Sequence, residues 1–370
     1  MNNILIVLFN DSLGGAEQYL KMVAEFFLKK EQEVYVIFLT KKTTKGWEEL
    51  ERYSNFKPFY PRTKNKFLGG IVAAKRCRTY RNIHFKYTFT SHVHITGLVG
   101  VLLKLNLYRT KYFVARESTS IFKRFSGIKL LLFKLQYKLG YAKIDLLICQ
   151  SEFMKQQLLE NLPQLASKMQ IEVIENPVDT ERINNAGLGQ TNLPAPKFDY
   201  MVSAGRLIEE KGFDILMEAF ARLKKNHQNL RLIILGEGKL RAPLEEQRKN
   251  LDLDEEILLP GFVPNVYHYF RAAQICVVSS RVEGFPNVLL QMMSQNNNVV
   301  STLCAGGIEK IDGVYTALPN DVDSLYEAIV DCLGNSNSEM GAKFQRELNS
   351  RDISSFMQKI DSILEKQPIK

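Results

Sequence analysis

The stretch "YMVSAGRLIEEKGFDILMEAFARL", Tyr200–Leu223, contains the strand, the turn and the helix that decide the fold of this chain. An apolar strand ends near Ala204, a glycine lets the backbone turn, and the residues after Gly212 have the apolar spacing of an amphipathic helix. A strand that leads into a helix is the repeating unit of a parallel sheet. The stretch therefore predicts an α/β domain with Arg206 and Lys211 at the carboxyl end of a strand.

The same alternation continues toward the C-terminus. The runs expected to form strands are "LRLIILG" (230–236), "EEILLPG" (255–261), "ICVVSS" (275–280) and "NNVVST" (297–302), and those expected to form helices are "KLRAPLEEQRKNL" (239–251), "NVLLQMMSQ" (287–295) and "DVDSLYEAIVDCLG" (321–334). Strands separated by helices favour a parallel sheet covered on both faces.

The N-terminal half repeats the pattern independently. Its expected strands are "ILIVLF" (4–9), "VYVIFL" (34–39), "KYTFTSH" (86–92), "KYFVARES" (111–118), "DLLICQS" (145–151) and "IEVIENP" (171–177). The sequence predicts an α/β chain of two Rossmann-like parallel-sheet domains facing a central cleft. We place the N-terminal domain at 1–183, a Gly-, Asn- and Pro-rich linker at 184–199 and the C-terminal domain at 200–350. Residues 351–370 are expected to form a helix that either stays with the second domain or returns to the first.

The bulk composition is that of a soluble globular protein. The 370 residues are 45% hydrophobic and 24% charged, and no apolar run approaches the ~20 residues needed to span a bilayer. The first residues lack the basic leader and the cleavage site of a signal peptide. The five cysteines have neither zinc-site nor redox-pair spacing, so we expect buried thiols in a reducing cytosol.

The net charge of +9 is very unevenly distributed. Between Arg52 and Ile144 there are twenty Lys or Arg and a single acid, Glu117, which gives this stretch a charge of +19. The remaining residues, with 29 basic and 39 acidic side chains, carry −10. One part of the chain is therefore strongly cationic, which is typical of a protein that meets a polyanionic surface, either nucleic acid or anionic lipid.

Cations and glycines follow the first strand of each predicted domain. Arg206 and Lys211 flank one loop, where a guanidinium fork and an ammonium would suit a diphosphate, although both could also be solvated surface cations. Gly14 and Gly15 precede a helix whose N-terminus could face phosphate, although they could equally form a tight turn. The chain has neither a GxGxxG motif after its first strand nor a P-loop, which disfavours a dinucleotide-binding protein and an NTPase.

A third stretch, "RVEGFPNVLLQ" (281–291), places an acid in a loop and an amide in the helix that follows. Pro286 suits the first turn of a helix, so Glu283 lies just before the helix and Gln291 projects from its second turn. Two polar groups at this separation can hold hydroxyl groups at two points of one extended ligand. A sugar and a ribose on either side of a diphosphate offer such hydroxyls.

With these motifs in view, the chain resembles the retaining GT-B glycosyltransferases of family 4, also called group 1, which transfer a sugar from a nucleotide diphosphate to an acceptor. The motifs that carry the resemblance are "GGAEQYL", "ICQSEFMK", "VIENPVD", "SAGRLIEEKGFDILMEAFARL", "LIILGEGKLRAPLE", "LPGFV", "SSRVEGFPNVLLQMM" and "VVSTLCAGGIEKI", in the order that the family has them. The resemblance covers nearly the whole chain and is strongest from Ser203 to Ile311.

The resemblance implies a role for each motif residue. Arg206 and Lys211 would neutralise the departing diphosphate, Glu283 would contact the donor sugar, and Gln291 would bind the ribose. The other residues that the resemblance places against the substrates are Gly14 and Gly15 beneath the diphosphate and the acceptor, Gly236 in the donor site, Gly261, Phe262 and Val263 against the nucleobase, and Gly284, Phe285, Asn287 and Val288 at the phosphate and sugar.

Two positions depart from the family pattern. Gln291 stands where the family has a second glutamate, and an amide can still bind ribose but without charge assistance, at about half the hydrogen-bond strength. Where many relatives have a histidine near the reacting sugar, this chain has Arg116 and Glu117. Glu117 is either an acceptor-facing catalytic base or a partner in an internal ion pair. His92 and His94 are expected to be structural.

The expected activity is that of a hexosyltransferase that retains anomeric configuration and needs neither metal nor cofactor. Its donor would be a nucleotide-diphosphate hexose or N-acetylhexosamine, with UDP favoured over GDP. Its acceptor would be a glycan or a polyprenyl-linked glycan in lipopolysaccharide O-antigen or capsule synthesis. The alternatives are a GT-B nucleotide-sugar 2-epimerase and a non-catalytic subunit that binds nucleotide sugar.

The basic segment predicts where the protein works. From Ser120 to Lys143, leucines and lysines interleave as in a helix that lies in a membrane interface, although the same helix could simply pack on the sheet. Nucleic-acid binding would explain the charge but not the phosphate motifs, so we expect no nucleic-acid partner. We predict a cytoplasmic protein held peripherally on the inner face of the cytoplasmic membrane through its N-terminal domain.

Overall fold

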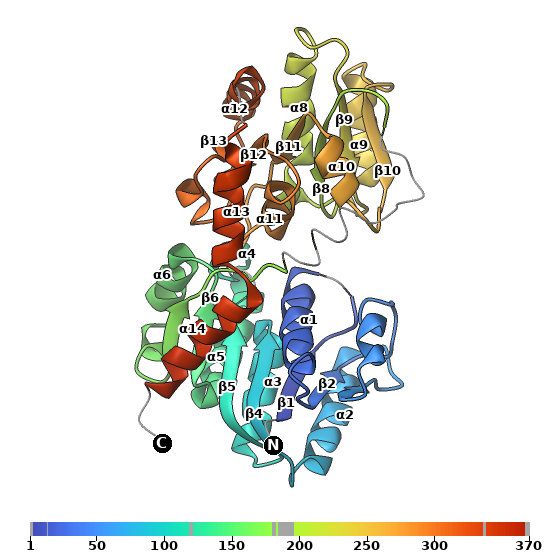
Figure 1. Ribbon diagram of the computed structural model, residues 1–370. Helices are drawn as coiled ribbons and strands as arrows, with labels where there is room; N and C mark the ends of the chain where they lie inside the picture. The colour runs from blue at the N-terminus through green and yellow to red at the C-terminus, as the bar shows by residue number, and fades with distance from the viewer. Residues whose placement is uncertain are drawn as a thin grey trace. The chain divides into compact units, whose positions relative to one another are not determined.

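The computed structural model describes residues 3–12, 14–117, 121–179, 183, 196–335 and 338–366. They form two compact units, each built on its own parallel sheet. Unit 1 runs to Pro177 and includes the segment from Ile353 onward, and unit 2 runs from Val178 to Asp352 (Figure 1). The two predicted Rossmann-like parallel-sheet domains are confirmed. Most of the predicted linker, 184–195, lies outside the described residues.

Unit 1 contains a seven-stranded parallel sheet in the order β3-β2-β1-β4-β5-β6-β7. Its strands are β1 (Asn3–Leu8), β2 (Val34–Phe38), β3 (Phe56–Phe59), β4 (His84–Ser91), β5 (Arg109–Arg116), β6 (Leu146–Cys149) and β7 (Gln170–Val173). Successive residues of β1 alternate between two apolar clusters, because side chains of a strand point to opposite faces. The sheet is therefore buried on both faces, as parallel sheets require.

Helices cover both faces of this sheet. They are α1 (Gly15–Leu28), α2 (Lys66–Thr79), α3 (Val93–Lys104), α4 (Ile121–Arg124), α5 (Gly127–Gly140), α6 (Glu152–Asn161) and α14 (Ile353–Glu365). The helices α1 and α14 share one apolar cluster, and α2, α3, α5 and α6 contribute to the other. Phe356 of α14 packs edge-on against Tyr19 of α1, with ring centroids 5.6 Å apart, so the C-terminal helix belongs to unit 1.

The helix predicted over 120–143 is not continuous. Ser120 lies outside the described residues, α4 ends at Arg124, and α5 begins at Gly127, whose φ of 60° is in the left-handed region. A residue in that conformation cannot continue a right-handed helix. The apolar and basic pattern of the segment is therefore carried mainly by α5.

Unit 2 contains a six-stranded parallel sheet in the order β10-β9-β8-β11-β12-β13. Its strands are β8 (Tyr200–Ala204), β9 (Arg231–Leu235), β10 (Ile257–Gly261), β11 (Ile275–Val278), β12 (Val299–Thr302) and β13 (Tyr315–Ala317), and its helices are α8 (Phe213–Leu223), α9 (Arg241–Asn250), α10 (Tyr267–Ala272), α11 (Asn287–Met293), α12 (Val322–Gly334) and α13 (Met340–Ser350). The helices α8, α9 and α12 cover one face, and α10, α11 and α13 the other. Within the described residues, no helix is long and apolar enough to span a bilayer.

Candidate functional site

The strand order of unit 2 contains a switch point between β8 and β11. The chain leaves β8 toward β9 on one side, while β11 lies on the other side. Loops that follow two such strands diverge and leave a crevice at the carboxyl edge of the sheet, where open α/β sheets bind ligands. The loop after β8 carries Arg206 and Lys211, and the loop after β11 carries Glu283. Strand order thus brings together residues 72 positions apart in the sequence.

Lys211 and Glu283 form the centre of this site. Lys211 Nζ lies 2.5 Å from Glu283 Oε1, and their side chains are 16% and 21% exposed. Ser280 Oγ donates to the same carboxylate oxygen at 3.0 Å, and the Glu283 backbone N–H donates to the Cys304 carbonyl at 2.9 Å. The carboxylate is therefore held by Ser280 of its own loop and by Lys211, and the backbone at Glu283 is held by the segment that follows β12. One lysine N–H is used by Glu283, and an ammonium has three, so the others can reach a phosphate oxygen.

Arg206 occupies the same edge but is exposed. Its guanidinium makes no hydrogen bond or ion pair with any residue that the structure describes. A guanidinium that is not occupied by the protein can offer a bidentate fork to an anion without first breaking an ion pair. The two predicted phosphate-binding cations therefore differ: Lys211 is held in place and Arg206 is not.

Glycines permit the close approach of the loops at this edge. Gly236 has a φ of 143°, and a Cβ added there would lie 1.8 Å from the Gly205 carbonyl oxygen. Gly261 has a φ of 89°, and a Cβ there would lie 2.7 Å from Glu237 Oε1. A larger residue at Gly236 would displace the backbone of the loop after β8, whereas one at Gly261 would be strained by the positive φ and would push the Glu237 carboxylate aside. Phe262, next in the chain, is 75% exposed and offers a bare aromatic face.

The segment from Gly284 to Val288 connects Glu283 to α11. Phe285 is buried in the apolar cluster of unit 2, and the guanidinium carbon of Arg351 lies 5.0 Å from its ring centroid. Its side chain therefore anchors the loop to the core of unit 2. Gly284 and the first helical residues, Asn287 and Val288, are half-buried.

Gln291 projects from the second turn of α11, as the sequence predicts. Its Nε2 donates to the hydroxyl of Tyr267 in α10 at 3.2 Å. The amide is therefore oriented by a residue that sequence reasoning did not identify, because nothing in the spacing of α10 marks Tyr267 as a neighbour of α11. Val263 packs against the apolar cluster of unit 2 to which α10 and α11 also contribute.

In unit 1, Gly14 and Gly15 are exposed at the start of α1, and Gly14 is its N-cap residue. The first turn also contains a buried acid, Glu17, whose Oε1 lies 3.3 Å from His92 Nε2. An acid in the first turn offsets part of the positive end of a helix. The two predicted glycines are therefore accessible, but the helix start is not an uncompensated anion site.

The structure does not support a catalytic-base role for Glu117. Its side chain is 3% exposed, and its two oxygens accept hydrogen bonds from Tyr137 Oη at 3.0 Å and Tyr141 Oη at 2.9 Å. Burial raises the pKa of this carboxyl to about 7. The alternative of an ion pair with Arg116 is wrong as well, because Arg116 instead donates to Asn176 and lies over the Tyr19 ring. Glu117 fastens α5 to the sheet.

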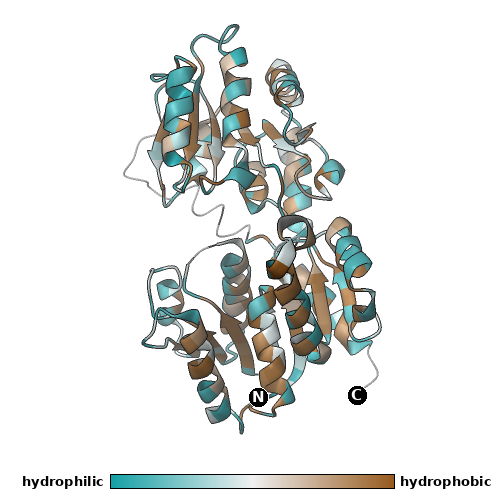
Figure 2. Cartoon of the chain, turned by 180° about the vertical axis from the view of Figure 1, so that it is seen from behind, coloured by the Kyte–Doolittle hydropathy of each residue, from teal (hydrophilic) through white to brown (hydrophobic). Residues whose placement is uncertain are grey.

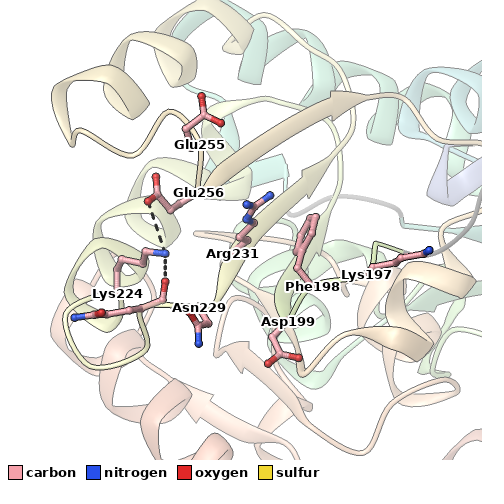
Figure 3. Close-up of a pocket in the computed structure, with 9 residues that line it drawn as sticks. Lys197, Phe198, Asp199, Lys224, Asn229, Arg231, Glu255 and Glu256 are labelled. Carbon is pink, nitrogen blue, oxygen red and sulfur yellow. Dashed lines mark hydrogen bonds and ion pairs between the residues drawn. The ribbon is translucent and has the colours of Figure 1, made fainter.

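A surface pocket of unit 2 lies away from the candidate site. It is lined by Lys197, Asp199, Lys224, Arg231 and Glu256, among others (Figure 3). These residues lie at the amino ends of the strands β8, β9 and β10 or in nearby turns, whereas parallel sheets bind ligands at the opposite edge. Lys224 is already engaged, with Nζ 3.7 Å from Glu256 Oε1.

Both halves of the chain match glycosyltransferase families. Residues 13–182 match the family described as Glycosyltransferase Family 4, and residues 199–335 match Glycosyl transferases group 1. The chain is 27% identical over 318 residues to N-acetylgalactosamine-N,N'-diacetylbacillosaminyl-diphospho-undecaprenol 4-alpha-N-acetylgalactosaminyltransferase of Campylobacter jejuni, covering 85% of this chain and 84% of that protein. It is also 29% identical over 166 residues to the lipopolysaccharide core biosynthesis glycosyltransferase LpsE of Rhizobium meliloti, covering 45% of this chain and 46% of the relative.

Solved structures share the fold. Anabaena HepE in complex with UDP and glucose superposes with a TM-score of 0.77 at 18% identity, covering 99% of this chain and 100% of that one. A glycosyltransferase from Rickettsia africae gives a TM-score of 0.75 at 19% identity, covering 99% of this chain and 98% of that one. At such identities the likeness supports the two-sheet architecture alone.

Proposed function

This chain belongs to the GT-B glycosyltransferases of family 4 and group 1, and we propose that it transfers a hexose or N-acetylhexosamine from a nucleotide-diphosphate sugar to a glycan or lipid-linked acceptor in cell-surface polysaccharide synthesis. A UDP-sugar is favoured over a GDP-sugar. The acceptor class is supported by the Campylobacter relative, whose name contains a diphospho-undecaprenol acceptor, and the pathway by LpsE, which is named for lipopolysaccharide core synthesis.

The observation that carries the proposal is the pairing of Lys211 with Glu283 at the switch point, beside an exposed Arg206. In the proposed mechanism Arg206 and Lys211 stabilise the negative charge that develops on the departing diphosphate. Glu283, held by Ser280, accepts hydrogen bonds from the sugar hydroxyls and remains paired with Lys211. The transfer retains anomeric configuration and uses no metal.

Gln291 contributes to the donor end. Its Nε2 is held by Tyr267, so its Oε1 is the atom available to accept a hydrogen bond from a ribose hydroxyl. A neutral amide binds that hydroxyl more weakly than a carboxylate does. Phe262 is the residue we assign to the face of the nucleobase, because its exposed ring offers a stacking surface beside Gly261.

Titration with UDP and GDP by calorimetry, in the presence of EDTA, tests the site. Replacing Lys211→Met removes a charge-assisted hydrogen bond worth about 1.5–3 kcal/mol, and we expect about tenfold to hundredfold weaker nucleotide binding. Lys225→Met changes an exposed lysine of the same unit away from this edge, and it should bind as the wild type does. Equal affinities for all three proteins would remove Lys211 from the site.

Product analysis separates the alternatives. A retaining transferase yields a glycoside of unchanged anomeric configuration only when acceptor is present, whereas a 2-epimerase converts the donor sugar without acceptor. A subunit that only binds nucleotide sugar gives neither product nor donor hydrolysis. Activity that disappears with EDTA and returns with Mg²⁺ would overturn the metal-independent mechanism.

We also propose that the protein works in the cytoplasm, peripherally on the inner face of the cytoplasmic membrane. The support is the +19 segment, which lies in unit 1 together with the exposed glycines Gly14 and Gly15. A lipid-linked acceptor is confined to a membrane surface, and a cationic surface concentrates the enzyme there. We assign no nucleic-acid partner.

A further inference from the structure

The helices α2, α3 and α5 leave an apolar surface that the proposed transfer does not use. Nine large apolar side chains on or directly after these helices are between 46% and 79% exposed: Phe67, Leu68 and Ile71 of α2, Leu105 after α3, and Ile128, Leu131, Leu132, Leu135 and Leu139 of α5. We call these nine residues the apolar face. Figure 2, which views the chain from behind, shows hydrophobic ribbon on the helices on this side of unit 1.

On α5 the exposed residues form one stripe. At 3.6 residues per turn, the five positions fall within an arc of about 100°. Lys129 lies beyond one edge of this arc, and Lys134 and Lys138 lie beyond the other. The opposite side is buried: Phe133 and Tyr137 pack in the core of unit 1. The helix therefore has two apolar sides, and its own sheet covers only one of them.

The three helices are neighbours, so their exposed residues belong to one surface. A Cβ added at Gly70 of α2 would lie 3.6 Å from Leu98 Cδ2 of α3. His94 of α3 is bound to Gln136 of α5, with Nδ1 2.7 Å from Oε1. The helix α3 therefore contacts α2 through the half-buried Leu98 and α5 through His94.

The charge around this surface has one sign. The exposed cations on the same helices are Lys66, Lys75, Arg78, Lys104, Lys129 and Lys138. The only acid between Arg52 and Ile144, Glu117, is buried and held by Tyr137 and Tyr141 from the inner side of α5. The surface therefore combines apolar side chains with lysine and arginine, and the stretch from Arg52 to Ile144 contributes no exposed carboxylate to it.

We propose that the apolar face docks on an anionic lipid bilayer, with its leucines, isoleucine and phenylalanine residues in the headgroup and acyl boundary and the surrounding cations on lipid phosphates. An interfacial helix has this arrangement of a wide apolar stripe edged by lysines. A bilayer with negative headgroups matches both the chemistry and the charge, because each exposed cation gains a phosphate partner as the apolar side chains leave water.

The placement of the surface also fits the acceptor, and this part of the inference rests on the proposed function. The helices α2 and α3 begin at the carboxyl edge of the unit 1 sheet, where Lys66 Nζ lies 4.6 Å from the centroid of the Phe9 ring, just after β1. Gly14 and Gly15 follow the same strand. An acceptor whose lipid chain stays in the bilayer can thus present its sugar at the border of this surface.

Flotation of the full chain with vesicles of phosphatidylglycerol and phosphatidylcholine tests the proposal. We expect the wild type to float with these vesicles at low salt and much less with pure phosphatidylcholine. The double variant Leu131→Ser and Leu135→Ser should lower the vesicle partition coefficient by about tenfold or more, since both side chains leave water on docking. The matched control, Leu318→Ser with Val330→Ser, removes exposed apolar side chains from unit 2 and should float like the wild type.

A second pair of variants tests the charge. Lys129→Glu with Lys138→Glu should abolish flotation at low salt, while Lys225→Glu with Lys249→Glu, which reverses two exposed lysines of unit 2, should reduce it far less. Equal losses in the two variants would mean that net charge alone drives binding, and the assignment to α5 would be overturned.

Insertion itself is measured with Leu132→Trp. The native Trp47 is the only tryptophan and is buried, so it gives a constant background. The new indole should shift its emission to the blue on anionic vesicles and be quenched by lipids brominated in the acyl chain. An unshifted spectrum with vesicles bound would place α5 outside the bilayer and overturn the proposal.

The outcomes separate docking from transfer. UDP affinity and transfer to a water-soluble acceptor should stay at wild-type levels in the Leu131 and Leu135 variant while flotation is lost. Transfer by all variants with unchanged flotation would refute the docking surface and leave the transferase assignment standing. If sedimentation shows that the wild type self-associates, and the Leu131 and Leu135 variant loses this self-association while vesicle binding is unchanged, the apolar face is a protein interface and the lipid assignment is refuted.

Discussion

Glu117 makes the stability of unit 1 depend on pH in a way that a single substitution should remove. The carboxyl is buried, and burial raises its pKa to about 7 from an ordinary value of 4.5. Below pH 4.5 it is protonated in both the folded and the unfolded chain. Between 4.5 and 7 the unfolded chain releases the proton while the folded chain keeps it, so the free energy of unfolding falls as the pH rises through this window. Above about 7 both forms are ionised and the loss is complete.

The size of this loss follows from the shift. A difference of about 2.5 pKa units at 1.36 kcal/mol per unit gives about 3 kcal/mol of stability that is present below pH 4.5 and absent above pH 7. Glu117→Gln cannot ionise. Its amide oxygen can accept from one of the two tyrosine hydroxyls, and its NH₂ can donate to the other. The variant should therefore keep a flatter pH profile and become the more stable protein above neutrality.

Urea unfolding followed by tryptophan fluorescence measures this effect in the correct unit, because Trp47 is the only tryptophan and lies in the core of unit 1. Unfolding curves of both proteins are collected between pH 4.5 and 8. The unfolding free energy of Glu117→Gln minus that of the wild type should change by about 3 kcal/mol across this range. Glu160→Gln, at an exposed acid of the same unit, serves as the control and should follow the wild type. Parallel profiles for Glu117→Gln and wild type would refute the assignment of a protonated, buried carboxyl.

Further predictions concern the donor site of unit 2. Glu283→Gln should lower the transfer rate by about a hundredfold while UDP affinity changes by less than about threefold, because UDP lacks the transferred hexose or N-acetylhexosamine that the carboxylate would bind; a matching loss of UDP affinity would contradict a role in binding that sugar. Gln291→Ala should weaken UDP binding by about threefold to tenfold in calorimetry, since one neutral hydrogen bond is lost, and unchanged affinity would remove Gln291 from the site. Gly236→Ala should lower the unfolding free energy of unit 2 by about 2–3 kcal/mol, because its Cβ would lie 1.8 Å from a backbone oxygen of the loop after β8. Gly334→Ala, where a Cβ meets nothing within 4 Å, should unfold at nearly the wild-type temperature.

The sequence located the donor-site motifs but not their partners. Arg206 and Lys211 could be assigned to a strand end because the strand and the helix around them are encoded by neighbouring residues. The contact between Lys211 and Glu283 depends on β11 lying beside β8, and no local pattern states which strand pairs with which. Tyr267 was missed for the same reason, since its contact with Gln291 joins two helices across 24 residues.

The basic segment illustrates a different limit. Its charge and its leucine content could be read directly, and so could the expectation of an interfacial helix. The sequence alone could not show which side of that helix faces water, because both sides are apolar. The packing of Phe133 and Tyr137 on the sheet, with Glu117 beneath them, decides that the Ile128 stripe is the exposed one.

By itself, the sequence determined two α/β domains, the family and the positions of the donor-site motifs, because strand and helix periodicity and turn chemistry act over a few neighbouring residues. Only the tertiary structure decided that Glu117 is buried and hydrogen-bonded to two tyrosines, that Lys211 and Glu283 are paired, and that the outer stripe of α5 is left uncovered. These features depend on strand order and on which helix face finds a partner, and both are set by burial summed over the whole unit.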